Sequence, residues 1–325
     1  MVIISLFINV DGDNMSIDEL KMLQLKIIKK NNMCNIVATI FISIIFLISI
    51  IMFLFNKIEL HFFIISIFFE LVFSIIIVII IKNVVNGKDI VLFNKNYKNI
   101  FVLKALKNNF DNVVYNPDNG FDKQFVSKVC MLNTGDRYIS NDFISGEYKG
   151  IKFEQADIHI EEEVEEKDSN GETKTVWETL FKGRLMVFDF NKNFKANIQV
   201  SSKAFDAATR SWNGGFTKVL MEDVEFNKNF YVCAQNEHEA FYILTPHFME
   251  KLKEINNKLK CGIMFCFINN RLHIAIDNNK DAFEYNVFKI IDEKEIEADI
   301  IKDIKVITEF VSELNLDNDL FRKEV

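Results

Sequence analysis

The stretch IVATIFISIIFLISIIMFLF, from Ile36 to Phe55, is twenty residues long and carries no charge. A second apolar stretch, FFIISIFFELVFSIIIVIII, runs from Phe62 to Ile81 and contains one charged residue, Glu70. At 1.5 Å per residue, about twenty helical residues cross a hydrocarbon core of about 30 Å. The bilayer interior offers no water to backbone groups, which favours helices despite the many β-branched residues. We therefore expect a transmembrane helical hairpin, connected by Asn56 to His61.

Lysines flank the two stretches but are scarce between them. The flanking lysines are Lys21, Lys26, Lys29, Lys30, Lys82, Lys88, Lys95 and Lys98, whereas the connection holds only Lys57, beside Glu59. Positive charge is retained on the cytoplasmic side of a membrane, so we expect both termini in the cytoplasm. The abundance of Ile, Asn, Lys and Phe is typical of an AT-rich bacterial genome. Together with the two apolar stretches, this composition suggests a multi-pass protein of the bacterial inner membrane.

Glu70 lies near the middle of the second stretch. A charge there costs about 2.5–3.5 kcal/mol on insertion, and each large apolar neighbour returns about 0.3–0.6 kcal/mol, so insertion survives. We expect the carboxyl to stay protonated or to find a partner, for which Ser43, Ser49, Ser66 and Ser74 qualify by chemistry. An ion or proton site, or a self-association contact, is one interpretation. A neutral acid against a neighbouring helix is simpler, because two helices enclose no pathway without oligomerising.

Composition restricts the remaining functions. The net charge of −8 argues against a general nucleic-acid binder. Five cysteines, at positions 34, 130, 233, 261 and 266, form no disulfide framework and suit a reducing compartment. Cys261 and Cys266 lack zinc-site spacing and no paired cluster completes four ligands, so we expect no metal or cofactor.

Residues 1–35 form the first region. The run before Asn14 lacks a positive leader and is a poor signal peptide, and Met15 is an alternative start to Met1. Ser16 and Glu19 make a capping box for a basic amphipathic helix that extends to about Lys30. This helix is expected either on the anionic membrane surface or packed against the soluble part of the chain.

Residues 83–142 are expected to be a helical connecting region, after spans assigned to 36–82. The helical pattern fades near Gly87. Further helices are predicted over Tyr97–Phe110 and Asp122–Leu132, with a short strand at Val113–Tyr115 between them. Residues 143–325 are expected to form an α+β cytoplasmic domain of antiparallel strands and packed helices that ends in a C-terminal helix.

In that domain the apolar period becomes two from Phe143. Apolar residues occupy odd positions up to Phe153 and even positions from Ile158, which suggests a bulge near Gln155–Asp157. Later elements are strands at Thr175–Phe190, Ala196–Ser201 and Phe230–Ala234, helices at Glu237–Leu244 and from Pro246, a hairpin of Ile263–Ile268 with Leu272–Ile276, and a final helix over Ile296–Leu314.

Two surface features of this domain attract attention. The turn at Asn170-Gly171 follows five glutamates, Glu161, Glu162, Glu163, Glu165 and Glu166, which could attract cations or a basic partner but are more simply a solvated tip. The loop Ser202–Met221 combines Arg210, Trp212 and Gly214-Gly215, and it is the best candidate for a functional loop. An ordinary surface loop remains the simpler interpretation.

No catalytic signature is evident. His238-Glu239 begins like a zinc-protease motif, but position 242 is Tyr. The nucleophile elbow, the phosphate loop and the dinucleotide fingerprint are missing. We therefore assign no catalytic, cofactor-binding or metal-binding residue, and keep Glu70, Arg210 and Trp212 as functional candidates. A pocket that gathers two or more of His159, His238, His247 and His273 would favour an enzyme.

Three ordered motifs carry a family resemblance. They are Phe181-Lys182-Gly183 leading to Phe188-Asp189-Phe190-Asn191-Lys192, then Glu222 to Phe230 (EDVEFNKNF), then Glu239 to Pro246 (EAFYILTP). Behind two membrane spans, this series resembles a family of uncharacterised bacterial membrane proteins defined by a domain of unknown function. The resemblance covers roughly Phe143 to Phe288 and the hairpin. It implies an α+β cytoplasmic domain on a two-helix anchor and brings no activity or catalytic residues.

The leading hypothesis is a non-enzymatic, membrane-anchored binding or scaffolding protein that engages a protein partner, or itself, at the bilayer. One alternative is an enzyme that acts near the membrane with a site no motif reveals. Another is an oligomeric transport or sensing element built on Glu70.

Overall fold

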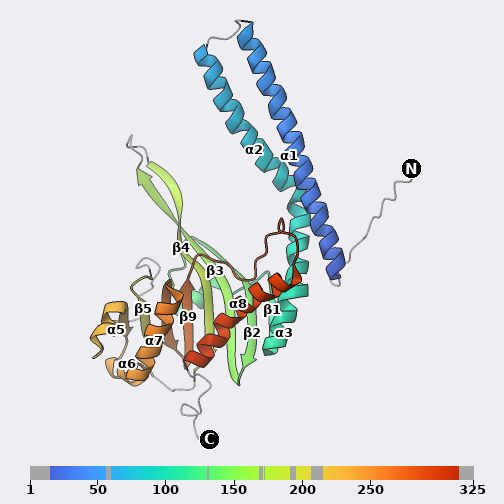
Figure 1. The fold of residues 1–325 in the computed structure, drawn as a ribbon. Coiled ribbons are helices and arrows are strands. Elements are labelled where there is room, and N and C mark those ends of the chain that lie inside the picture. Colours follow the sequence, from blue (N-terminus) through green and yellow to red (C-terminus); the bar gives the residue numbers. More distant parts are fainter. Residues whose placement is uncertain are drawn as a thin grey trace. The chain divides into compact units, whose positions relative to one another are not determined.

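The computed structural model describes residues 15–55, 60–129, 132–167, 171, 173–190, 195–205 and 215–314 (Figure 1). The chain divides into two compact units. A helical unit comprises Met1–Val102 and Tyr285–Ile296, and a sheet unit comprises Leu103–Glu284 and Glu297–Val325. The chain therefore leaves the sheet unit at Glu284, contributes a short segment to the helical unit, and returns. Each unit is described separately.

The helical unit contains two helices of 38 residues, α1 (Ile17–Leu54) and α2 (Leu60–Tyr97), followed by one π-helical turn, η1 (Lys98–Val102). The capping box at the start of α1 is present, because Ser16 accepts from the Glu19 backbone and Glu19 accepts from the Ser16 backbone. The expectation that the second helix fades near Gly87 is wrong. A glycine inside a helix costs only about 0.5–1 kcal/mol, which the surrounding helical contacts outweigh.

The two helices pack side by side within this unit. Phe53 stacks on Phe63 with ring centroids 4.6 Å apart, and Lys30 pairs with Asp89 at 2.5 Å. Of the helices in the described part of the chain, α1 is long and apolar enough to cross a membrane. The apolar part of α2, His61–Ile76, is shorter and falls below that length.

The first half of α1 is buried along one face. Leu20, Leu23 and Ile27 lie there with the polar side chain of Gln24. Gln24 donates to the carbonyl oxygens of Val287 (2.9 Å) and Lys289 (2.5 Å), and accepts from the Ile291 N–H at 3.1 Å. The predicted basic helix is therefore the start of one continuous helix, and its apolar face packs against the protein's own Tyr285–Ile296 segment.

The sheet unit is built on one nine-stranded sheet among the described residues, with the order β1-β2-β3-β4-β9-β8-β5-β7-β6 and antiparallel pairing throughout (Figure 1). The strands are β1 (Asp111–Asn116), β2 (Arg137–Tyr148), β3 (Ile151–Lys167), β4 (Thr173–Asp189), β5 (Ile198–Ser202), β6 (Thr217–Val219), β7 (Phe230–Ala234), β8 (Gly262–Ile268) and β9 (Arg271–Asp277). The helices are α3 (Leu103–Asn109), α4 (Lys123–Lys128), α5 (Val224–Asn229), α6 (Glu237–Ile243), α7 (Pro246–Leu259) and α8 (Glu293–Glu313).

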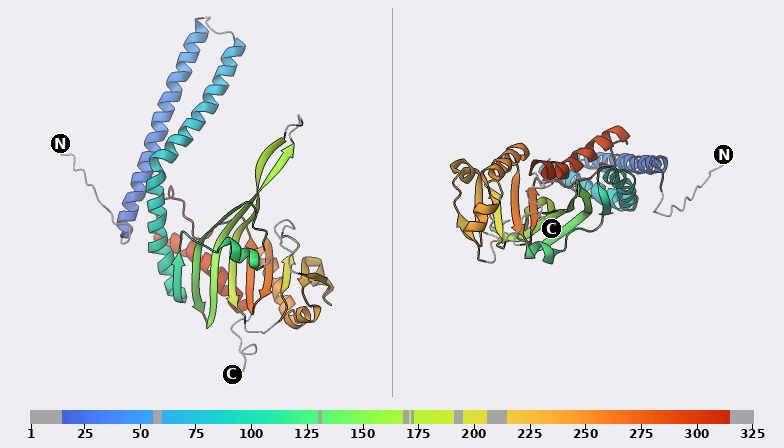
Figure 2. Two further views of the ribbon diagram at one scale, coloured as in Figure 1. Left: turned by 180° about the vertical axis from the view of Figure 1, so that it is seen from behind. Right: turned by 90° about the horizontal axis from the view of Figure 1, so that it is seen from below.

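Helices cover both faces of this sheet, with α4 and α8 on opposite sides (Figure 2). The α4 side holds a buried cluster that includes Val126, Ile158 and Leu185. On the other side, Phe310 of α8 packs near Phe188 and Phe265, with ring centroids 6.5 Å apart in both pairs. The expected α+β class, with a long apolar N-terminal helix and a large antiparallel sheet, is confirmed.

Two local expectations need correction. The parity change along β3 is not caused by a bulge in that strand: Phe153 is buried on one face and Ile158 on the other, because different elements cover the two faces. The register irregularity at this level lies between Asn141 and Ile144 of β2. The region 83–142, expected to be a helical connection with one short strand at Val113–Tyr115, contains that strand within β1 and also supplies the first half of β2 to the sheet.

Candidate functional site

Glu70 finds its partner on the neighbouring helix. The Ser49 hydroxyl donates to Glu70 Oε1. Of the residues from Ile36 to Phe55, Ser49 is the only buried one. Of the other serines, Ser43 donates within its own helix to the Thr39 carbonyl oxygen. The polar pair Ser49–Glu70 therefore joins the two helices within their apolar stretches.

A half-open cleft of about 120 Å³ lies beside this pair. Its lining residues are Ile42, Ile45 and Phe46 of α1 with Ile67, Glu70 and Ser74 of α2. The lining is thus apolar except for one carboxyl and one hydroxyl. Because Glu70 is already bonded to Ser49, this arrangement agrees best with the simpler interpretation, an acid satisfied by the adjacent helix.

The other two residues singled out from the sequence, Arg210 and Trp212, lie outside the described residues. The four histidines named as a test of an enzymatic site are dispersed. His159 and His273 lie on opposite faces of the sheet, since His159 pairs with Lys182 whereas His273 pairs with Val187. His238 and His247 are exposed on α6 and α7. In the part of the chain that the structure describes, no group of three or more His, Cys, Asp or Glu side chains is arranged to hold a metal ion.

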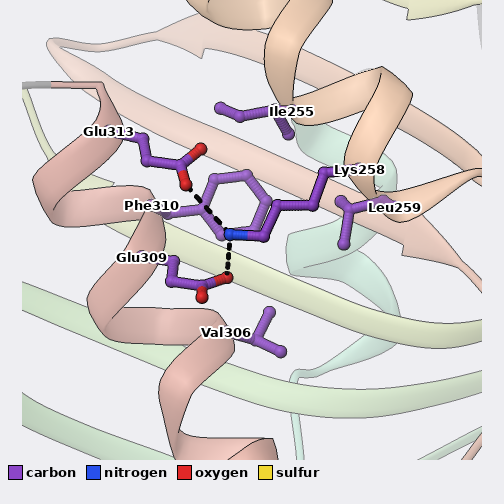
Figure 3. Close-up of a pocket in the computed structure, with 7 residues that line it drawn as sticks. All are labelled: Ile255, Lys258, Leu259, Val306, Glu309, Phe310 and Glu313. Atoms are coloured by element: carbon purple, nitrogen blue, oxygen red, sulfur yellow. Dashed lines mark hydrogen bonds and ion pairs between the residues drawn. The ribbon is translucent and has the colours of Figure 1, made fainter.

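Figure 3 shows the seam between α7 and α8. Lys258 of α7 extends toward α8 and pairs with Glu309 at 2.9 Å and Glu313 at 3.0 Å. The cavity at this seam measures about 10 Å³ and is lined mainly by apolar groups such as Ile255 and Phe310. This volume accommodates at most one water molecule. The seam is therefore a helix–helix contact in which one lysine forms ion pairs with two glutamates of the other helix.

The most unusual chemistry in the sheet unit is a buried group of charges beneath α8. Arg184 of β4 donates to Asp303 of α8 twice, to the backbone oxygen at 2.8 Å and to Oδ1 at 2.5 Å. Asp157 of β3 lies directly opposite Arg184 in the register, with Nε 3.8 Å from Oδ1. Asp157 is fully buried and Arg184 nearly so. One guanidinium thus stands between two carboxyl groups.

The loop before α8 is held by the same two carboxyl groups. The Ala282 N–H donates to Asp157 Oδ2, and the Phe283 N–H donates to Asp303 Oδ2 at 3.0 Å. Phe283 adopts a left-handed backbone (φ 58°), which is rare for an aromatic residue. These contacts fix the path of the chain where it leaves β9.

A third carboxyl group, Asp142, is buried nearby on β2. It accepts from the Tyr115 hydroxyl at 2.5 Å and from Asn141 Nδ2 at 2.8 Å. Burial, then the charge of Asp142, raise the pKa of Tyr115 above its ordinary range. Burial also raises the pKa of Asp157 to about 7, against the opposing attraction of Arg184.

Sequence reasoning missed this group. Asp157 stands between Ala156 and Ile158, and Arg184 between Gly183 and Leu185, so each is a charge between two uncharged neighbours in a strand. A charge in a buried strand needs a partner, and two such charges on neighbouring strands are a recognisable signal. The signal was masked because Asp157 lay within the segment interpreted as a bulge.

The outer part of β3 and β4 forms a two-stranded ribbon. Glu162–Lys167 pairs with Thr173–Glu178, and beyond the Arg137–Glu161 pair no further strand joins this ribbon in the described residues (Figure 1). At its base the Arg137 guanidinium lies 3.5 Å from the ring centroid of Trp177, which is 38% exposed. The ribbon therefore presents an aromatic and a stacked arginine to solvent, beside the row of glutamates.

Comparisons with known proteins give the following results. A search of curated proteins finds no match. The crystal structure of the mycobacterial trehalose monomycolate transport factor A, TtfA, is 9% identical, with a TM-score of 0.35 over 68% of this chain and 95% of that chain. A likeness of that size carries no argument about this protein. The family model described as "Protein of unknown function (DUF3137)" matches residues 179–316. Residues 179–316 of this chain are therefore similar to the uncharacterised DUF3137 family.

Proposed function

We propose that this protein is a membrane-anchored binding protein of the bacterial inner membrane. In this proposal Ile36–Phe55 and Phe62–Ile81 cross the bilayer as a hairpin, and the sheet unit lies in the cytoplasm. The observation that carries it is the exposure of α1, on which only Ser49 is buried between Ile36 and Phe55. Exposing a contiguous apolar surface of that kind to water is energetically unfavourable, whereas exposing it to lipid is favourable.

The pattern of charges supports the orientation. The lysines in the first half of α1, before its apolar stretch, and those after the apolar part of α2 would lie on one side, which the positive-inside rule assigns to the cytoplasm. Extraction of native membranes with alkaline carbonate should leave the protein in the pellet. Its recovery in the supernatant would exclude membrane spanning.

Orientation is tested with cysteines labelled by a membrane-impermeant maleimide. Leu220 is 65% exposed in the sheet unit, and Lys57 lies in the sequence between the two apolar stretches. Lys57→Cys should gain label in intact cells, relative to the unsubstituted protein, and Leu220→Cys only after lysis. Labelling of Leu220→Cys in intact cells would place the sheet unit outside.

A binding role is supported by the ribbon. A two-stranded ribbon is marginally stable on its own, and this one is largely uncovered on both faces. Exposed Trp and Arg side chains are typical of residues that contribute strongly to protein–protein affinity. We therefore place the partner's contact at Arg137 and Trp177.

The test is a crosslinking pull-down of the full-length protein from its native membranes. A stoichiometric partner should be recovered, should be lost with Trp177→Ala, and should be retained with Tyr242→Ala. Tyr242 is the control because it is another aromatic side chain, 55% exposed on α6. Equal recovery with both variants would contradict the assignment of the ribbon.

A further inference from the structure

The charges beneath α8 do not balance. Two carboxyl groups, those of Asp157 and Asp303, share the guanidinium of Arg184, and the charge of a third buried carboxyl group, Asp142, also acts on Asp157. An unpaired charge in a buried site is costly, and a carboxyl group avoids that cost by taking up a proton. At least one of the three is therefore expected to be protonated over part of the physiological pH range.

Hydrogen bonding identifies which of the three takes the proton. Asp142 accepts from the Tyr115 hydroxyl and Asn141 Nδ2, and Asp303 accepts from Arg184 and the Phe283 N–H. Asp157 accepts only from the Ala282 N–H among the described residues. Donors stabilise the ionised form, so Asp157 is the carboxyl group whose ionised form is least stabilised.

The free oxygen of Asp157 supports the same conclusion. Asp157 Oδ1 is buried with no hydrogen-bond partner in the described part of the chain, and both side-chain polar atoms of Gln155 share that condition. Gln155 lies two residues earlier on the same face of β3. A proton on Asp157 Oδ1 would turn an unmatched acceptor into a donor, and the Gln155 side chain on the same face holds one unmatched acceptor, Oε1, beside one unmatched donor, Nε2.

We propose that Asp157 is a proton-binding site whose occupancy decides how firmly α8 docks on the sheet. Protonated Asp157 leaves Arg184 to Asp303 and so holds α8. Ionised Asp157 competes with Asp303 for the guanidinium and adds a buried negative charge next to Asp142. The elements that transmit the change are β4, through Arg184, and the loop of Ala282 and Phe283.

The charged groups near Asp157 shift its protonation in opposite directions. Arg184 favours the ionised form, whereas the charges of Asp142 and Asp281 favour the protonated form. Lys182 partly neutralises Asp281 at 3.1 Å. Tyr115 interacts with Asp142 and Asp157 and stays neutral because its pKa is raised. Burial outweighs the attraction of Arg184, which is why the pKa of Asp157 is raised to about 7.

The sign of the pH dependence follows. The pKa of Asp157 is about 7 when α8 is docked, and it returns toward the ordinary value of about 3.9 when the site opens to water. The docked state therefore binds more protons above about pH 4. The contribution of protonated Asp157 to the docking free energy of α8 is therefore largest below about pH 4 and is lost as the pH rises through 7. Between pH 6 and pH 8 the opening constant of α8 should rise about tenfold.

Hydrogen exchange of the full-length protein in detergent micelles tests this proposal, after correction for the intrinsic pH dependence of exchange. Amide protection in α8 should fall about tenfold from pH 6 to pH 8 in the wild type. In Asp157→Asn it should stay constant. Equal pH dependence in the two proteins would overturn the proposal.

Two further readouts separate a proton site from a merely structural residue. Asp303→Asn releases Arg184 to Asp157, so the step in α8 protection should move to lower pH, and an unmoved step would contradict the competition for the guanidinium. Protection of β8 amides should change less than that of α8. A matching loss in both elements would show that Asp157 controls the whole fold and not the docking of α8.

Discussion

Glu70 and Asp157 are both carboxyl groups in apolar surroundings, and the two units of the chain accommodate them differently. Glu70 accepts from the hydroxyl of Ser49, 21 residues away on the adjacent helix. Asp157 depends on Arg184 of the next strand, on Ala282 in a loop, and on neighbouring carboxyl groups from other elements. In the helical unit the solution is local and simple, whereas in the sheet unit it is shared among distant segments. Substitutions at the Ser49–Glu70 contact should therefore be tolerated, whereas substitutions around Asp157 should be costly.

The strongest test of this comparison is Arg184→Met. The substitution removes the cation that pairs with both Asp157 and Asp303, and it leaves two buried or half-buried carboxyl groups without that partner. At pH 8 we expect a loss of about 3–5 kcal/mol in the free energy of unfolding. Lys182→Met is the matched control, because Lys182 lies two residues earlier on the same face and is partly exposed. Its loss should stay below about 1 kcal/mol.

Urea titration of the full-length protein in micelles, followed by circular dichroism, measures both variants. A similar loss from Lys182→Met and Arg184→Met would mean that burial of the arginine does not matter. In that case the contrast between the two units would fail.

Replacement of a glycine by alanine should change stability in opposite directions in the two units. A Cβ at Gly183 would lie 1.9 Å from the Ile276 carbonyl oxygen of β9, so the backbone of two strands must move. We expect Gly183→Ala to cost about 1–3 kcal/mol. A Cβ at Gly87 meets nothing within 4 Å, and Gly87→Ala should stabilise α2 by about 0.5–1 kcal/mol. Thermal melting that shows destabilisation at both positions would contradict this expectation.

Gln24→Leu tests how the segment after Glu284 is held. The variant removes three hydrogen bonds to backbone groups of Val287, Lys289 and Ile291. Unsatisfied buried backbone groups cost about 1–3 kcal/mol, so hydrogen exchange over Tyr285–Ile291 should rise at least tenfold. Asn32→Leu on the exposed side of α1 is the control and should leave this exchange unchanged. If both variants behave alike, Tyr285 stacking on Tyr97 (ring centroids 5.1 Å apart) holds the segment without Gln24.

The smallest expected effect is that of Ser49→Ala. Hydrogen bonds between helices in a membrane contribute about 0.6 kcal/mol on average, because the separated helices also find partners. Titration of the micelle-bound protein with a denaturing detergent should show a loss of that order. Ser43→Ala should show none, since Ser43 bonds within its own helix. A loss above about 2 kcal/mol would show that Glu70 depends on Ser49 as strongly as Asp157 depends on its network.

Elements with local signals were predicted well. The strand Phe230–Ala234 has the predicted limits, and α7 begins at Pro246 behind the Thr245 cap. The hairpin of β8 and β9 turns at Asn269 and Asn270, which both adopt left-handed backbones (φ 53° and 58°). The strand β6 and the helix α5 were missed. Both are short, and their stability comes from neighbours that only the folded chain supplies.

The sequence alone determined that the chain has two long apolar helical stretches and an α+β domain, because helix formation and strand alternation depend on residues close together in the chain. The tertiary structure decided the strand order, the docking of Tyr285–Ile296 in the helical unit, and the charges beneath α8. Arg184 and Asp303 are 119 residues apart, and Asp157 and Ala282 are 125 apart. A pattern of local periodicity contains no record of such pairs, since their attraction arises only after folding has removed both partners from water.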